Sequence, residues 1–296
     1  MRMKSQKNDL HITDEVSELT NTVLGIAVSP GQPRGINAKA AEAIQKGFYP
    51  SEAELILAMK GFENVLSEQG VTVLKPNNID DLNQIFVRDL GFVVDDIFIV
   101  ASMKETVRSP ELDGLSQVLE FFHPDKIIRP PEGVYIEGGD IVLAKDTIFV
   151  GIGRRTNEAA VGFLRTIFSN KRIIPLETQY ASSDPRVSIL HLDCAFQPVG
   201  SQYAILYEKG FVSPPKVIFD LFGTENIITV SSEEMYQMVP NIFSISPSKV
   251  VSCASFVRLN KLLKERGIDV ISIDYENVSI LGGLLRCSTL PLSRKN

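Results

Sequence analysis

A repeat of about fifty residues is the strongest constraint that this sequence places on its fold. Four segments each read as two short apolar strands joined by a two-residue polar turn, a pattern typical of β-hairpins. Their turns begin at residues 95, 145, 200 and 247. The even spacing predicts that one small structural unit is used several times along the chain.

Helical patterns separate the hairpins, and each helix is followed by another strand. Ser51 and Glu54 form a capping box ahead of one helix, and a second helix begins at Thr156. A third helix covers residues 255–266 and stops at Gly267, a residue type that suits the left-handed position after a helix. The strands that follow are expected at residues 71–74, 172–174 and 270–273. The repeating unit is therefore strand-strand-helix-strand.

The two ends of the chain are expected to supply a fifth unit. An apolar strand at residues 284–290 lies where the next hairpin is due, and the strand at residues 22–28 lacks a partner. Pairing these strands would close a ring, although open solenoids also repeat at such periods. We predict an α/β fold in which residues 21–296 form a single ring-shaped domain of five ββαβ units, preceded by a flexible leader over residues 1–20.

Composition narrows the classes of function. Hydrophobic residues make up 44% of the chain and charged residues 22%, as in ordinary globular proteins, and the formal net charge is −6. A mildly acidic surface argues against nucleic acid or an anionic membrane as partner, since both select clustered lysine and arginine. The first residues lack the apolar core of a signal peptide, and no apolar run has the roughly 18 residues of a membrane helix. We expect a cytoplasmic protein that accepts a small molecule.

The cysteines and histidines do not have the spacing of a metal site or a disulfide framework. No cysteine pair has the Cys-x-x-Cys spacing, and no histidine lies three or four residues from another. The residues concerned are Cys194, Cys253, Cys287, His11, His123 and His191. We therefore expect neither a metal nor a disulfide, and we interpret His11 and His123 as loop residues.

An acidic residue precedes the first strand of three successive hairpins. These residues are Asp89, Glu137 and Asp193, and His191 lies two positions before the last of them. Taken singly, such an acidic residue is usually a turn residue, and a lone histidine in an apolar run is more often part of the core. In a ring, however, equivalent positions point at a common centre, and residues two apart on a strand share a face. The recurrence favours a site that binds a planar cation such as guanidinium through forked hydrogen bonds.

Cys287 is the thiol that we expect to be reactive. A cysteine beside apolar residues is most often a buried structural thiol. Two glycines shortly before it permit a close backbone approach, and Arg286 adds positive charge nearby, although strand alternation points Arg286 away. Closure of the ring would also place this strand at the central cavity. The same alternation turns Cys194 out of the cavity, and Cys253 opens a helix.

Five motifs, taken together in their order and spacing, resemble the guanidine-modifying pentein enzymes. This group comprises the arginine deiminases, the dimethylarginine dimethylaminohydrolases and the amidinotransferases. The motifs are FVRD (86–89), IEGGD (136–140), GIGRRTN (151–157), HLD followed by Phe (191–196) and RCSTLPL (286–292). The resemblance runs from about residue 22 to residue 292. It implies a five-bladed α/β propeller of pseudo-fivefold ββαβ repeats, in agreement with the repeat.

The resemblance also implies catalytic roles. Cys287 corresponds to the nucleophile, His191 to the general acid and base, and Glu137 to the acid that supports the histidine and the substrate. The thiolate of Cys287 would add to the guanidinium carbon and form a covalent thiouronium intermediate. His191 would protonate the departing nitrogen and then activate water. No cofactor is implied.

Four further residues correspond to positions that bind substrate. Asp89 and Asp193 match the carboxylates that grip the guanidinium. Arg155 stands where some deiminases hold the substrate α-carboxylate, but Arg154 is adjacent and the sequence does not choose between them. The loop at residues 29–35 differs from the relatives, and its glycine and proline content suits either a lid or a surface turn.

These features favour a hydrolase of arginine or an N-substituted arginine, with a role in arginine metabolism. The products would be a ureido compound and ammonia or an alkylamine. An amidinotransferase, which passes the amidino group to an acceptor amine, stays an alternative, and a non-catalytic binding ring is less favoured because all the catalytic residue types are present. A papain-like hydrolase is disfavoured because there the cysteine precedes the histidine. The identity of the guanidino compound and the existence of a homodimer stay open.

Overall fold

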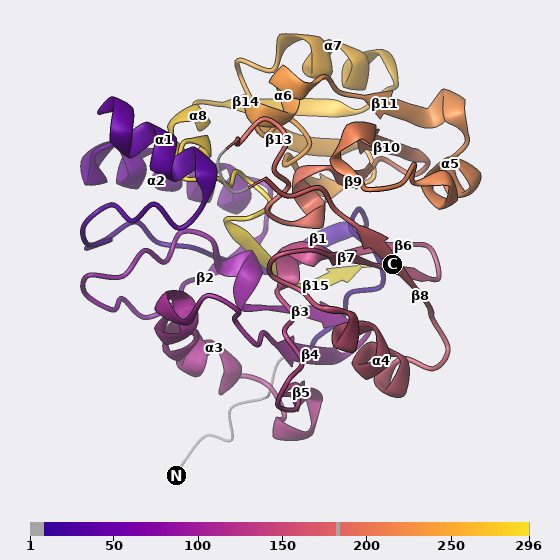
Figure 1. Ribbon diagram of the computed structural model, residues 1–296, viewed down its shortest axis with the longest axis horizontal. Helices are drawn as coiled ribbons and strands as arrows, with labels where there is room; N and C mark the ends of the chain where they lie inside the picture. The colour runs from indigo at the N-terminus through magenta and orange to yellow at the C-terminus, as the bar shows by residue number, and fades with distance from the viewer. Residues whose placement is uncertain (1–8, 182–183, 296) are drawn as a thin grey trace.

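The strands in the described part of the chain form five small sheets of three strands each (Figure 1). A computed structural model describes residues 9–181 and 184–295. In every sheet the central strand pairs with one neighbour in antiparallel and with the other in parallel. A hairpin followed by a crossover to the same sheet produces this arrangement. Each sheet is therefore one ββαβ unit, as the repeat predicts.

Four sheets are built from consecutive strands, and their hairpins lie where the repeat places them. These sheets are β3 (Gly91–Val94), β4 (Ile97–Val100) and β5 (Ile127–Ile128); β6 (Ile141–Ala144), β7 (Thr147–Ile152) and β8 (Arg172–Glu177); β9 (Phe196–Val199), β10 (Tyr203–Leu206) and β11 (Ile227–Thr229); and β12 (Phe243–Ser246), β13 (Lys249–Cys253) and β14 (Asp269–Ile273). The turn residues Asp95 and Lys145 have φ angles of 53° and 55°, which suit the tight turns that match the twist of paired strands.

The fifth sheet joins the two ends of the chain. β15 (Thr289–Lys295) pairs antiparallel with β1 (Glu18–Leu24), and β1 pairs parallel with β2 (Thr72–Leu74). Figure 1 shows the yellow β15 beside the indigo β1. The predicted pairing of the chain ends is confirmed, but β15 starts later than expected. Residues 284–288 form a turn instead, closed by the Ser288 backbone N–H donating to the Leu284 carbonyl over 3.0 Å.

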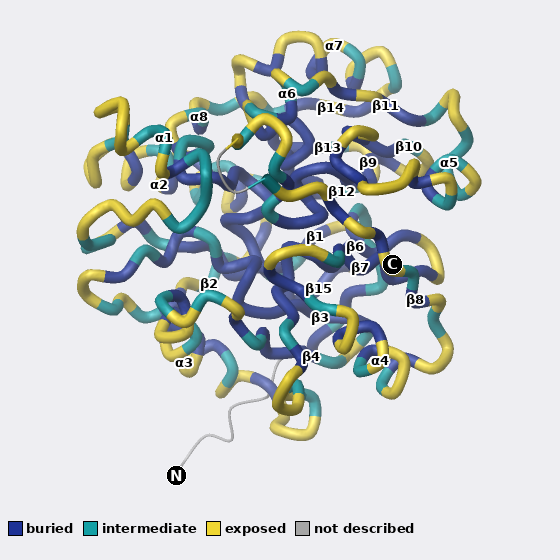
Figure 2. The backbone as a smooth tube through the Cα atoms, viewed as in Figure 1, coloured by how far each residue is buried: buried dark blue, intermediate teal, exposed yellow. Residues whose placement is uncertain are grey.

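The helices lie around the outside of the sheets, where Figure 2 shows most of the exposed backbone. They are α1 (Ala38–Lys46), α2 (Glu52–Glu68), α3 (Ser116–Leu119), α4 (Glu158–Ile167), α5 (Lys216–Phe222), α6 (Ser232–Tyr236), α7 (Val257–Glu265) and α8 (Glu276–Ser279). The predicted capping box is present at the start of α2, where Ser51 and Glu54 each accept a hydrogen bond from the other's backbone N–H. Among the described helices, none has both the length and the apolar character needed to cross a membrane.

The packed part of the chain begins earlier than the expected leader would allow. Leu10 and Ile12 are buried, and Ile12 forms an antiparallel bridge with Asp95. β1 also starts before residue 21. Residues 1–8 of the expected leader lie outside the described residues. The rest of that segment is part of the folded unit, because it lies against the closing sheet and the neighbouring hairpin.

We expect Phe62→Ala to destabilise the fold strongly. Phe62 is fully buried in α2 and meets Phe243 and Tyr275 edge to face, with ring centroids 5.9 and 5.5 Å apart. Removing such a side chain leaves a cavity and costs about 3–5 kcal/mol. Urea unfolding should show this loss, whereas Phe48→Ala, at a residue that is 72% exposed, should change the free energy of unfolding by no more than about 0.5 kcal/mol. Equal losses in the two variants would contradict this description of the core.

Candidate active site

Three short 3₁₀ turns carry the acidic residues and the histidine of the predicted site. Each turn lies directly before the first strand of one sheet. The turns are η1 (Val87–Leu90), η4 (Gly138–Asp140) and η5 (Leu192–Cys194). Asp89 lies within η1, and Glu137 and His191 immediately precede η4 and η5. Because the same turn recurs in three units, side chains from three separate parts of the sequence reach one place.

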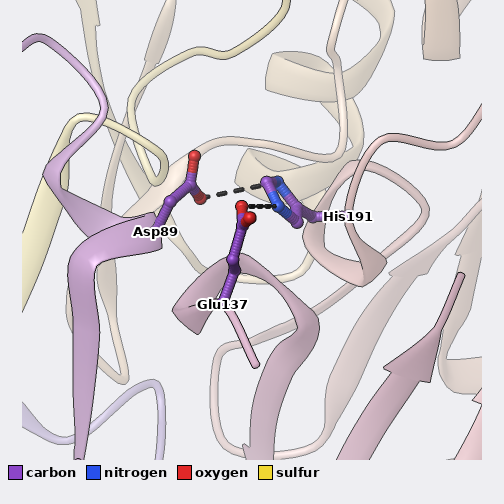
Figure 3. Close-up of side chains that lie close together, drawn as sticks. All are labelled: Asp89, Glu137 and His191. Atoms are coloured by element: carbon purple, nitrogen blue, oxygen red, sulfur yellow. Dashed lines mark hydrogen bonds and ion pairs between the residues drawn. The ribbon is translucent and has the colours of Figure 1, made fainter. Parts of the chain in front are cut away.

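Asp89, Glu137 and His191 form a buried cluster (Figure 3). Nε2 of His191 lies 2.8 Å from Oε2 of Glu137, and Nδ1 lies 3.4 Å from Oδ1 of Asp89. The chain can pack this closely because position 139 is glycine. A Cβ atom on Gly139 would lie 2.7 Å from Cγ of His191, which is closer than side-chain atoms approach. The predicted convergence of these three residues is therefore present in the structure.

The cluster holds a charged histidine at neutral pH. Burial opposes the charge on His191, but the neighbouring carboxylates of Asp89, Asp140 and Glu137 outweigh it and raise the pKa of His191 to about 10. Burial likewise opposes the charge on Glu137, but the hydrogen bond from His191, together with the charges of His191 and two arginines, lowers the pKa of Glu137 to about 2. His191 is thus an imidazolium that can donate a proton, and Glu137 is a carboxylate.

The structure separates His191 from Asp193, contrary to the prediction that the two share a face. The chain forms a 3₁₀ turn here instead of a strand, and at three residues per turn positions i and i+2 point in different directions. The carboxylate of Asp193 pairs with Arg286, whose Nη1 lies 2.6 Å from Oδ2. Asp193 is fully buried and is absent from the described residues that line the main cavity. The predicted contact of Asp193 with a substrate guanidinium stays a prediction.

Cys287 opens onto the main cavity, which has a volume of about 430 Å³. Asp89 and His191 line the same cavity, as do residues 29–34 of the loop that suits either a lid or a surface turn. Sγ of Cys287 lies 3.7 Å from Oδ2 of Asp193. A hydrogen bond from the Cys287 thiol to Cys194, burial and the negative charges of Asp193 and Asp89 together raise the pKa of Cys287 well above its usual range. The resting thiol is therefore neutral.

Arg108 is a site residue that the sequence reasoning missed. It lies in η2 (Thr106–Leu115), its Nη1 is 2.6 Å from Oδ2 of Asp89, and its Nε and Nη2 are 2.7 and 2.8 Å from the two carboxylate oxygens of Glu111. Arg108 and Glu111 both line the cavity. Asp89 thus already binds a guanidinium group, that of Arg108. The spacing Arg-x-x-Glu was the sole signal in the sequence, and it is too common to single out a site.

Only one of the two adjacent arginines reaches the cavity. Arg155 lines it and is fully buried, with Nη1 3.3 Å from Oε2 of Glu137. Nε and Nη2 of Arg155 have no hydrogen-bond partner among the described residues. Arg154 instead extends to Glu105, at 2.7 Å, and contacts Tyr180, with 35% of its side chain exposed. The geometry therefore favours Arg155 as the arginine that contacts a ligand.

The same cluster has donors that could hold a cation. One ligand atom from each of Asp89, Glu137 and His191 lies within 4.8 Å of the others. A metal ion would have to displace the guanidinium of Arg108 from Asp89 and remove the proton from His191, because only the neutral imidazole is a ligand. An organic cation with N–H donors would also have to displace Arg108 from Asp89, but it could bind without removing the proton from His191. The arrangement suits a guanidinium better than a metal ion.

Sequence comparisons connect the chain with enzymes that act on guanidino groups. The family model described as "N,N dimethylarginine dimethylhydrolase, eukaryotic" matches residues 35–294. An uncharacterised protein, YkgA of Bacillus subtilis, is 30% identical over 71% of this chain and 70% of its own length. An arginine deiminase of Listeria monocytogenes is 30% identical over 54% of this chain, and the match spans 47% of the deiminase. This chain therefore covers about half the length of that curated relative.

A solved structure supports the fold across the whole chain. SxtG, an amidinotransferase from Microseira wollei, superposes with a TM-score of 0.78 and 18% identity, covering 97% of this chain and 98% of SxtG. At this identity the similarity concerns the fold alone. It confirms the predicted five-bladed α/β propeller, with one sheet in each blade.

Replacing Glu137 by glutamine should lower the pKa of His191. The carboxylate of Glu137 stabilises the imidazolium, so its neutralisation in Glu137→Gln should shift the His191 titration from about 10 downward by roughly 1–3. NMR titration of the imidazole protons can follow this shift, since the chain has only three histidines. Asp125→Asn, beside the exposed His123, is the matched control and should leave His191 unchanged. An unaltered His191 titration in Glu137→Gln would refute the assigned pairing.

Proposed function

The chain belongs to the N,N-dimethylarginine dimethylhydrolase family of the guanidine-modifying pentein superfamily, and we propose that it is a cysteine-dependent hydrolase of a small guanidino compound. One observation carries this proposal. A single cavity brings together the thiol of Cys287, the imidazolium of His191 and the carboxylate of Asp89, which already holds a guanidinium group. These are the groups needed to bind a guanidinium, attack its carbon and protonate a leaving nitrogen.

Asp89 is the proposed binding group for the substrate guanidinium. Nη1 of Arg108 lies 2.6 Å from its Oδ2. A substrate guanidinium would take over this carboxylate, while Arg108 keeps its two hydrogen bonds to Glu111. The exchange replaces one buried ion pair by another, so the carboxylate is never left unpaired. Asp89 would also fix the plane of the guanidinium, which orients its carbon for attack.

The positive charge of the substrate would help to activate Cys287. The hydrogen bond from its S–H to Cys194, burial and the negative charges of Asp193 and Asp89 keep the Cys287 thiol protonated. A guanidinium bound beside the sulfur offsets these charges and stabilises the thiolate. The reactive form of the cysteine would then exist mainly when the substrate is bound, and the free enzyme would react slowly with other electrophiles.

The reaction would proceed in two halves. The Cys287 thiolate forms a bond to the guanidinium carbon, and the imidazolium of His191 donates its proton to one nitrogen as the bond between that nitrogen and the carbon breaks. Ammonia or an amine leaves, and a thiouronium remains on Cys287. The now neutral His191 takes a proton from water, whose oxygen bonds to the carbon. The carbon–sulfur bond then breaks, which restores the thiolate and releases a ureido product, and the second proton of the water passes to solvent or to the departed amine.

Arg155 would bind an anionic part of the substrate. Its Nε and Nη2 are buried donors without a hydrogen-bond partner among the described residues, although Nε lies 4.0 Å from Oε1 of Glu105, and such donors are costly unless a ligand satisfies them. The carboxylate of an arginine-like amino acid fits this requirement, because it accepts two hydrogen bonds from one guanidinium. Arg108, which lies on the same cavity, can contribute once it leaves Asp89. An arginine or N-substituted arginine is therefore the proposed class of substrate.

An amidinotransferase is the second candidate, because the same thiol, imidazolium and carboxylate in one cavity could pass the amidino group to an acceptor amine instead of water. The two reactions break different bonds to the guanidinium carbon and use different acceptors. Product analysis with arginine, alone and with glycine as acceptor amine, separates them. A ureido product formed without an acceptor supports the hydrolase. Turnover only in the presence of the acceptor would reject the hydrolase in favour of the transferase.

Loss of the nucleophile should abolish turnover. We expect Cys287→Ala to lower kcat on the order of 10³-fold or more, since the covalent intermediate forms on its sulfur and neither of the other two cysteines lines the cavity. Release of ammonia and alkylamine from arginine, methylated arginines and agmatine is the measurement. Cys253→Ala is the matched control, because Cys253 is a buried thiol of β13 that is absent from the residues lining the cavity. Turnover by Cys287→Ala at the wild-type rate would overturn the mechanism.

A further inference from the structure

A second thiol, that of Cys194, lies beside Cys287. Strand alternation predicts that Cys194 points away from the site, but the residue lies in the turn η5 and is fully buried. It lines a small cavity of about 30 Å³ next to the main one. Leu190 and Gly282 line both cavities, so the two share a wall. Cys194 and Cys287 therefore line two adjoining cavities.

Both sulfur atoms contact the carboxylate of Asp193. Sγ of Cys194 lies 3.6 Å from its Oδ1, and Sγ of Cys287 lies 3.9 Å from Oδ1 and 3.7 Å from Oδ2. Because both sulfur atoms contact Oδ1 of the same carboxylate, the two thiols are neighbours. Both cysteines are free, and neither is fixed in a sheet, since Cys194 lies in a 3₁₀ turn and Cys287 precedes β15. Small backbone adjustments that would break strand pairing elsewhere are tolerated in such turns.

We propose that Cys194 is a resolving thiol, which forms a reversible disulfide with Cys287 when a peroxide oxidises the site. The inference rests on the proposed role of Cys287 as the reactive thiol, but it does not depend on which guanidino compound is the substrate. The disulfide would block the nucleophile and switch the enzyme off. It would also protect Cys287 from further oxidation to the sulfinic and sulfonic acids, which are not restored by thiols.

The oxidation balances as two successive displacements. The thiolate of Cys287 attacks one oxygen of hydrogen peroxide, the O–O bond breaks and hydroxide leaves, so the sulfur is oxidised by two electrons to a sulfenic acid. The sulfur of Cys194 then attacks the sulfenic sulfur, the S–O bond breaks, and hydroxide leaves with the proton from Cys194 as water. Two thiols and one peroxide thus give one disulfide and two molecules of water. A dithiol reductant reverses the change.

The surroundings tolerate the loss of the two thiols. Asp193 keeps its ion pair with Arg286, at 2.6 Å, so its carboxylate is not left unpaired when the thiols are consumed. The main cavity, of about 430 Å³, admits a molecule as small as peroxide. Because the resting thiol of Cys287 is neutral, its oxidation should be slow near neutral pH and should become faster as the pH rises.

The test uses the full chain, hydrogen peroxide at mildly alkaline pH, alkylation of free thiols and mass spectrometry of the intact protein and its peptides. The wild type should lose two hydrogens and two alkylatable thiols, give a cross-linked peptide pair containing Cys194 and Cys287, and recover both thiols with dithiothreitol. Cys253→Ala should behave in the same way. Cys194→Ala should instead gain oxygen atoms on Cys287 that dithiothreitol does not remove, and Cys194→Ser should do likewise.

Three outcomes would overturn the proposal. The first is a wild type that gains only oxygen atoms, and the second is a cross-link that involves Cys253. The third is a wild type that stays unchanged under the same peroxide treatment that oxidises Cys287 in Cys194→Ala. The wild-type result alone decides the matter if both Cys194 variants fail to fold. Since the readout is mass, a disulfide that forms in a protein inactive on every guanidino compound would leave this inference standing while the proposed function fails.

Discussion

The pairing of β1 with β15 is the contact on which the site depends. It closes the ring of five sheets and brings the segment before β15 against the turn that carries Asp89, where the Arg88 backbone N–H donates to the Cys287 carbonyl over 3.0 Å. The other site residues come from the turns before β3, β6 and β9, each held in place by its own hairpin. Without the closing sheet, the thiol and the carboxylate would belong to opposite ends of an open chain. Function therefore requires closure, and closure is encoded at the two ends of the sequence.

The site is a set of buried charges that balance one another. Asp89 and Glu137 face His191, Arg108 and Arg155 at distances of 2.6–3.4 Å. Burying an isolated charge costs several kcal/mol, so each of these groups is stable only because it is paired. The position at which Asp89 binds a cation is therefore preformed. A ligand that brings its own guanidinium can exchange with Arg108 without exposing an unpaired carboxylate. This explains how a polar site can persist in the centre of a folded chain without its ligand.

Much of the fold follows from local patterns, whereas the site depends on details that such patterns do not carry. The hairpins and the capping box at Ser51 could be predicted because strand alternation, turn residues and helix caps are set by neighbours in the sequence. The start of β15 and the direction of Asp193 were mispredicted because both segments form turns where strands were expected. The pairing of Arg108 with Asp89 and the contacts of Cys194 and Cys287 with one carboxylate depend on the tertiary fold, and nothing in the local sequence indicates them.

The central claim is that Cys287 forms a covalent bond to the guanidinium carbon of the substrate. Rapid acid quench during turnover, followed by mass spectrometry of the peptide that contains Cys287, tests it directly. We expect a substrate-derived adduct on Cys287. In a hydrolase a terminal nitrogen leaves, and the adduct keeps the amino-acid skeleton. In a transferase the adduct contains only the amidino group. An active protein that shows no adduct on Cys287, or an adduct on another residue instead, would contradict the account.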